Sequence, residues 1–384
     1  MRYGAELFLD KVEKGEILRP AALLTHQAAL VEDRMTTLEG FLRKGVSLKR
    51  VFFPQHGFFQ EKQDNMKESS SFFWKGIPFT SLYGERFAPA PEELEGVEVL
   101  YYDLQDVGTR IYTFISTLFL LMESLSGRGI ELVILDRPDP LGGVEVEGNL
   151  VGKEFLSFVG IDSLPMRYAL TPGELARLFL KRHRWDLELR VERVQGWSRG
   201  VLFGETGRFW IPPSPNMPSP EAALVYPGAV LLEGTNLSEG RGTTRPFEIC
   251  GAPYLDADLC AMEMNGLALP GVHFLPYRFT PTFNKGCGES VQGVFWRVTD
   301  PKLFRPYRTG LALIRTLRGL APESFRWALP PYEYEKERLP IDILTGGVEG
   351  RLFMEGGEGM EKLMEADERL FREERAECLL YPEA

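Results

Sequence analysis

Cysteine and histidine are scarce in this chain, with only four of each among 384 residues. The cysteines do not form a Cys-x-x-Cys pair, and no zinc-binding spacing of cysteine and histidine occurs. So few cysteines in a chain of this length exclude a disulfide scaffold and favour a reducing, cytoplasmic setting. We therefore assign no metal ligands. The four cysteines are Cys250, Cys260, Cys287 and Cys378.

A net positive charge and long apolar runs are also lacking. The net charge is −11, which disfavours nonspecific binding to nucleic acid or to an anionic membrane. No stretch approaches the roughly 20 apolar residues of a membrane helix. The segment Met1–Glu16 is amphipathic and charged, unlike a signal peptide. We expect a cytoplasmic protein with neither a nucleic-acid nor a membrane partner.

Two common cofactor motifs are missing as well. The chain has no Gly-x-Gly-x-x-Gly and no Gly-Lys-Ser/Thr, so a nucleotide site is not expected and we predict no cofactor. Gly196–Gly200 has the spacing Gly-x-Ser-x-Gly, but no predicted helix follows it, so we do not expect a serine nucleophile on a strand-to-helix elbow. Carboxylate chemistry is the better prediction.

What is present is an alternation of strand and helix signals through the first half. This order predicts an α/β domain with a parallel sheet and helices on both faces. Proline interrupts the chain at Trp210–Pro220, and an α+β pattern follows. We place a boundary near Tyr226, giving domains 1–225 and 226–384. Predicted strands are 21–25, 47–53, 80–83, 97–102, 131–135, 187–194, 230–232 and 291–298, and predicted helices are 3–14, 36–43, 111–125, 172–184, 311–320 and 359–374.

Polar clusters follow several predicted strands. Ligands of open parallel sheets bind at the carboxyl ends of strands, so these clusters are expected to meet at one edge. His26 and His56, each just past a strand, are the better histidine candidates. The clusters are Thr25–Gln27, Gln55–Gly57, Asp103–Arg110, Asp136–Arg137 and Glu233–Arg241.

The stretch from Val97 to Phe114 is the most informative of these. A buried strand leads into a cluster of acids, an arginine and a tyrosine that solubility alone does not explain. Glycoside hydrolysis uses two carboxyl groups that flank the scissile bond. Aromatic platforms for a sugar could come from Tyr112, Trp210 or Trp296.

Five motifs in this order resemble the DUF1343 family, which includes the exo-β-N-acetylmuramidases called NamZ. The resemblance implies a Rossmann-like N-terminal domain without a nucleotide, a smaller C-terminal domain and a cleft between them. It also implies removal of terminal β-linked N-acetylmuramic acid from peptidoglycan fragments, so the expected partner is a small glycan or muropeptide. The motifs are Asp103–Thr113, Leu135–Pro138, Glu147–Asn149, Pro213–Pro218 and Glu233–Thr243.

One position departs from the family. Its usual loop reads Pro-Glu-His-Gly, whose glutamate is the favoured catalytic acid, but this chain has Gln55 there. An amide cannot donate a catalytic proton. Glu61, Glu68 or Glu147 could take the acid role. Alternatively, the chain is a hydrolase of a different small substrate, or a noncatalytic sugar or muropeptide binder that keeps the cleft.

The predicted site combines these motifs with the polar clusters that follow the predicted strands. The catalytic set is Glu61, Glu147 and His56, with His56 positioning the substrate. Arg241 is expected to pair with the lactyl carboxylate, because a guanidinium matches a carboxylate in a bidentate fashion. The predicted substrate-binding residues are His26, Gln55, Asp103, Asp106, Arg110, Tyr112, Asn149, Asn236, Glu239 and Arg241.

Overall fold

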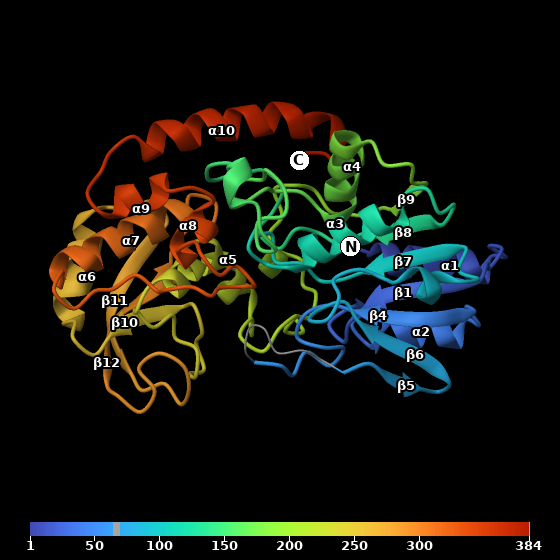
Figure 1. Ribbon diagram of the computed structural model, residues 1–384, viewed down its shortest axis with the longest axis horizontal. Coiled ribbons are helices and arrows are strands. Elements are labelled where there is room, and N and C mark those ends of the chain that lie inside the picture. Colours follow the sequence, from blue (N-terminus) through green and yellow to red (C-terminus); the bar gives the residue numbers. More distant parts are fainter. Residues whose placement is uncertain (64–69, 384) are drawn as a thin grey trace.

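The computed structural model describes residues 1–63 and 70–383. The chain has a larger part built on a seven-stranded sheet and a smaller part built on a three-stranded sheet (Figure 1). A single buried apolar cluster joins them, since it includes Leu100 and Leu118 of the larger part together with Trp296 and Leu311 of the smaller. The two parts are therefore packed against each other.

The large sheet has the strand order β5-β6-β4-β1-β7-β8-β9. All neighbouring pairs are parallel except β5 with β6 at one edge. Central strands are buried on both faces, as parallel strands covered by helices must be. The strands are β1 (Ala21–Thr25), β4 (Leu48–Phe53), β5 (Phe72–Trp74), β6 (Ile77–Ser81), β7 (Val99–Asp103), β8 (Glu131–Leu135) and β9 (Leu189–Glu192).

Helices cover both faces of this sheet. Side chains of α1 (Gly4–Glu13) and α2 (Thr37–Arg43) pack on one face. Those of α3 (Phe114–Leu125) and α4 (Pro172–His183) pack on the other. The predicted α/β class is thus confirmed. A small hairpin of β2 (Leu30–Val31) and β3 (Met35–Thr36) precedes α2.

The smaller part is α+β, as predicted. Its antiparallel sheet has the order β10-β12-β11. Helix α6 packs on this sheet, and α7 packs against α5. The elements are α5 (Pro220–Ala229), β10 (Ile249–Ala252), α6 (Ala257–Gly266), β11 (Val272–Phe279), β12 (Val291–Val298), α7 (Pro306–Leu320), α8 (Pro340–Thr345) and α9 (Glu349–Met354).

Helix α10 (Met360–Arg375) crosses from the smaller part back to the larger one (Figure 1). At its end Arg375 donates hydrogen bonds to the carbonyl oxygens of Gly143 and Ala169. Tyr381 then donates its hydroxyl proton to Asp136, which directly follows β8. The C-terminal segment therefore ties the two parts together. The domain boundary between residues 225 and 226 lies within α5 and stays a prediction.

One predicted strand is wrong. Val230–Leu232 belongs to a 3-10 helix, η4 (Val230–Gly234), which continues directly from α5. A short buried apolar run fits a helix segment as well as a strand, so periodicity could not separate them. Within the described residues, no helix combines the length and the apolar character needed to cross a bilayer.

Candidate active site

Four of the five predicted polar clusters lie at one edge of the large sheet. They follow β1, β4, β7 and β8, which run parallel, so their carboxyl ends share that edge. The fifth cluster, Glu233–Arg241, begins in η4 and comes from the smaller part. It therefore does not follow a strand.

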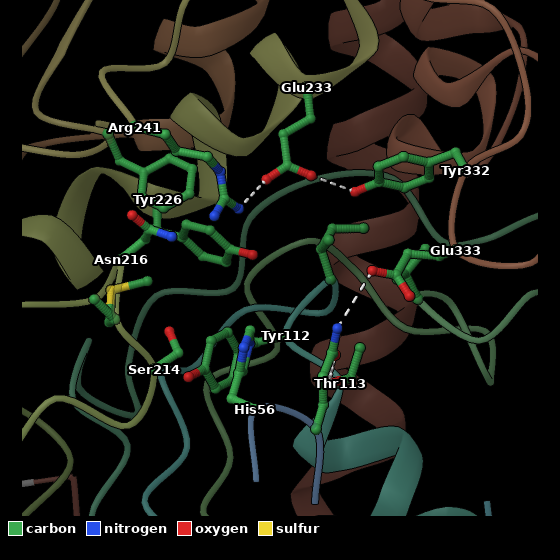
Figure 2. A pocket seen from close by; sticks show the side chains of 15 residues that line it. His56, Tyr112, Thr113, Ser214, Asn216, Tyr226, Glu233, Arg241, Tyr332 and Glu333 are labelled. Carbon is green, nitrogen blue, oxygen red and sulfur yellow. Dashed lines mark hydrogen bonds and ion pairs between the residues drawn. The ribbon is translucent and has the colours of Figure 1, made fainter. Parts of the chain in front are cut away.

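A pocket lies between this edge and the smaller part, lined by side chains from both (Figure 2). Four predicted site residues line it: Gln55, His56, Tyr112 and Arg241. The other polar lining residues were not predicted as site residues, although four of them, Thr113, Ser214, Asn216 and Glu233, lie in the motifs found in the sequence. The remaining three, Tyr226, Tyr332 and Glu333, lie outside those motifs.

The acids of the informative stretch are buried and engaged by the protein. Asp103 forms an ion pair with Arg137, whose Nη2 lies 3.1 Å from Asp103 Oδ2. Asp106 accepts hydrogen bonds from the Gly108 N–H and the Tyr168 hydroxyl. Burial raises the pKa of Asp106 to about 6. These contacts fix the loop after β7, and substrate binding by either acid stays a prediction.

Arg110 and Asn149 join the larger part to α8 and α7. The Arg110 guanidinium donates to the carbonyl oxygens of Asn149, Leu164 and Leu344, at 3.0, 2.9 and 2.8 Å. Asn149 in turn accepts a hydrogen bond from the Tyr307 hydroxyl at 2.9 Å. Burial lowers the pKa of Arg110 to about 10, which leaves it charged at neutral pH. Both side chains act as links between the two parts.

The two strand-end histidines differ in what they can do. His26 is fully buried, and its Nε2 accepts a hydrogen bond from the Gln105 N–H at 2.9 Å. His56 lines the pocket, and its Nδ1 lies 2.8 Å from the Lys62 carbonyl oxygen. A carbonyl only accepts, so Nδ1 carries the proton and Nε2 is an acceptor. Burial lowers the pKa of His56 to about 4, so its ring is neutral at pH 7.

The three glutamates considered for the acid role are not brought together. Glu61 is half exposed and pairs with Lys62. Glu147 is fully buried and accepts a hydrogen bond from the Arg308 N–H at 2.9 Å, near α7. Glu68 lies outside the described residues. Among the described residues that line the pocket, the carboxyl groups belong instead to Glu233 and Glu333.

Arg241 sits between two carboxylates in the pocket wall. Its Nη2 lies 2.6 Å from Glu233 Oε1, and its Nε lies 3.2 Å from Glu239 Oε1. Lys285 also pairs with Glu239, at 3.0 Å. Burial would lower the pKa of Arg241, but the charges of Glu233 and Glu239 outweigh it and raise that pKa. Arg241 is therefore a fixed, permanently charged group.

The loop that carries Arg241 depends on tight turns. Gly240 has a φ of +77°, and a Cβ there would lie 2.7 Å from the Ile249 side chain. Asn236, in the same loop, accepts hydrogen bonds from the Arg326 N–H and the Tyr254 hydroxyl, both at 3.0 Å. Asn236 thus holds the loop to its neighbours, and a direct contact with substrate stays a prediction.

Glu333 reaches the pocket from the loop before α8. It accepts a hydrogen bond from the Tyr83 hydroxyl at 2.9 Å and a longer one from the Gln55 amide at 3.4 Å. The residue is only 4% exposed. Burial raises the pKa of Glu333 to about 7, and the nearby charge of Glu233 acts in the same direction. This carboxyl group holds a proton far more readily than an ordinary glutamate.

Comparison with known proteins identifies the class of this two-domain α/β protein as a family of glycosidases. The family model for the N-terminal domain of exo-β-N-acetylmuramidase NamZ matches residues 21–221. The model for the C-terminal domain of the same family matches residues 224–381. The chain therefore belongs to the NamZ family, as its motifs predicted.

A curated relative is peptidoglycan β-N-acetylmuramidase NamZ of Bacillus subtilis (strain 168). It is 40% identical over 340 residues, which cover 88% of this chain and 80% of the relative. A solved DUF1343 family protein from Bacteroides fragilis NCTC 9343 is 29% identical with a TM-score of 0.88, covering 99% of this chain and 98% of its own. A second protein from that strain, 24% identical with a TM-score of 0.72 over 100% and 99% of the two chains, shares the fold.

Proposed function

We propose that the chain is an exo-β-N-acetylmuramidase that removes a terminal N-acetylmuramic acid from peptidoglycan fragments. The observation that carries the proposal is the pocket between the two parts, where two glutamates face His56, Tyr112 and a permanently charged arginine. Membership of the NamZ family supports the reaction class. A cytoplasmic site of action stays a prediction from the sequence.

The lactyl group separates N-acetylmuramic acid from other amino sugars by adding a carboxylate. Arg241 is suited to bind it. In the described part of the chain its ion pairs use Nη2 and Nε, which leaves the Nη1 group for a ligand. Charged hydrogen bonds of this kind are strong and directional. The neutral His56 ring and the Ser214 hydroxyl can contact sugar hydroxyl or acetamido groups.

The test is release of a chromophore from a chromogenic β-N-acetylmuramide, with the matching β-N-acetylglucosaminide as the control substrate. We expect turnover of the muramide well above buffer, and little or none of the glucosaminide. Absence of turnover between pH 5 and 8 would contradict the proposal. Preferred hydrolysis of the glucosaminide would refute recognition of the lactyl group.

A noncatalytic muropeptide binder is the second candidate, because Gln55 lines the pocket at the position where the resemblance implies a catalytic glutamate. Calorimetry separates the two functions. Heat of binding without product formation supports a binder, whereas accumulation of free N-acetylmuramic acid rejects it. A muropeptide with an intact terminal sugar is the ligand for this measurement.

A further inference from the structure

We propose that Glu333, in the smaller part of the chain, is the proton donor to the leaving-group oxygen, with Gln55 positioning it. This inference rests on the proposed function and deepens it. Gln55 follows β4 in the larger part, and an amide has no proton of suitable acidity. The catalytic acid must therefore come from another side chain that reaches the pocket.

The position of Glu333 is set by both parts of the chain. Oε2 accepts from Tyr83 and Oε1 faces the Gln55 amide. The Gln55 carbonyl oxygen accepts in turn from the Thr113 hydroxyl at 2.5 Å. Because the Thr113 hydroxyl donates to the Gln55 oxygen, the NH₂ group of the Gln55 amide points toward Glu333.

The backbone also holds Glu333 in place. Glu333 and Tyr334 have φ values of +43° and +71°, in the left-handed region that side chains other than glycine rarely occupy. Tyr332 and Glu335 exchange backbone hydrogen bonds at 2.9 Å across this bend. Strained backbone of this kind clusters at functional sites, where the surrounding structure enforces it. Here it turns the carboxyl group into the pocket (Figure 2).

The second pocket glutamate has different surroundings. Glu233 is ion-paired with Arg241 at 2.6 Å and accepts a hydrogen bond from the Tyr332 hydroxyl at 2.6 Å (Figure 2). Among the described residues, Glu333 accepts hydrogen bonds from two neutral donors, Tyr83 and Gln55. When two carboxyl groups in one site have such different environments, one stays ionised and the other keeps its proton and can act as the acid. The ion pair with Arg241 favours the ionised form of Glu233, which leaves the acid role to Glu333. Burial, which raises the pKa of Glu333 to about 7, supports the acid assignment.

The step balances without any further reactant. The bond between C1 and the leaving oxygen breaks, its electron pair stays on that oxygen, and the Glu333 proton joins it, releasing an alcohol. Water then gives its oxygen to C1 and one proton back to the site. The proton count of the site is thus restored after each turnover.

The experiment compares Glu333→Gln with the unaltered protein on two β-N-acetylmuramides. One has a sugar leaving group, and the other has 2,4-dinitrophenol, which departs without protonation. General acid catalysis contributes about 10²- to 10⁴-fold, so we expect a loss of that size on the sugar substrate. On the dinitrophenyl substrate we expect less than about tenfold loss, because no proton is needed.

The matched control is Glu337→Gln, an exposed glutamate in the same loop. It should behave like the unaltered protein on both substrates. Calorimetric binding of N-acetylmuramic acid to Glu333→Gln shows whether that variant keeps a folded pocket. The pH profile gives an independent readout. On the sugar substrate the unaltered protein should show an alkaline fall in kcat/KM near pH 7, and Glu333→Gln should lack that fall.

The outcomes separate the two proposals. If the unaltered protein hydrolyses neither substrate, the proposed function fails. If it hydrolyses both and Glu333→Gln retains full activity on the sugar substrate, the function stands and the role of Glu333 is refuted. Equal losses on both substrates would also refute proton donation, because they would indicate a role that does not depend on the leaving group.

Discussion

The side chains of Gln55 and Glu333 meet between the two parts of the chain, with Nε2 of Gln55 3.4 Å from Oε1 of Glu333. These residues are 278 positions apart in sequence. The contact places an amide from the end of β4 against a buried carboxyl group of the smaller part. Gln55, at the position where the sequence resemblance implies a catalytic glutamate, therefore contacts a carboxyl group from the smaller part of the chain.

Gln55→Glu tests whether Gln55 marks lost catalysis. The variant places a second carboxyl group within hydrogen-bond reach of Glu333, and two such groups cannot readily both ionise. We expect the alkaline limb of the kcat/KM profile to move upward by about one pH unit. Turnover at pH 6 should stay within about twofold, because Glu333 already supplies the proton. A gain of tenfold or more would show that the acid was missing.

Arg241→Lys tests recognition of the lactyl carboxylate. Lysine keeps the positive charge between Glu233 and Glu239 but loses the planar fork. We expect about 1.5–3 kcal/mol less binding energy for the muramide, the range of a hydrogen bond to a charged group. Steady-state kinetics on the muramide and calorimetry with N-acetylmuramic acid measure the loss. Unchanged selectivity over the glucosaminide would place lactyl recognition elsewhere.

Arg110→Lys separates a structural role from a substrate-binding one. Three carbonyl oxygens lose their shared donor group, two of them in the larger part and one, Leu344, in α8. We expect the substitution to lower the free energy of unfolding, measured by urea denaturation, by about 2–4 kcal/mol and to change KM little. The exposed Arg128→Lys is the control. A raised KM at unchanged stability would instead favour the predicted contact between Arg110 and substrate.

Glu61→Gln and Glu147→Gln test the two glutamates that were predicted from the sequence as possible proton donors. Glu61 is half exposed beside Lys62, and Glu147 is buried against the Arg308 backbone. Glutamine keeps the acceptor that the Arg308 N–H needs. We expect both variants to lose less than about threefold in kcat on the sugar substrate, far below the loss for a catalytic acid. A loss of a hundredfold in either would move the proton donor to that residue.

Much of the fold could be predicted because the buried strands are short apolar runs bounded by turn residues. The strands 21–25, 131–135 and 291–298 were predicted with the bounds that the structure has. The strand-end position of Gln55 and His56 likewise followed from the parallel sheet. The local sequence pattern predicts the position of a residue when that position depends only on the strand to which the residue belongs or which it follows.

The remainder of the candidate site depends on packing between distant segments. Glu333 lies in a proline-flanked loop without periodicity, and only the fold brings it to Gln55 and Tyr83. Asp103 and Arg110 were predicted to bind substrate, but the protein itself supplies partners for both. Asp103 pairs with Arg137, and Arg110 donates to three backbone carbonyl oxygens. Buried polar groups require such partners, but the sequence does not show which groups they are.

The most direct test of the account is incubation of the protein with two disaccharides of opposite order. One has N-acetylmuramic acid β-1,4-linked at the non-reducing end of N-acetylglucosamine, and the other has the sugars reversed. We predict that mass spectrometry will detect both free sugars from the first and none from the second. Cleavage of the reversed disaccharide, or of neither, would contradict the account.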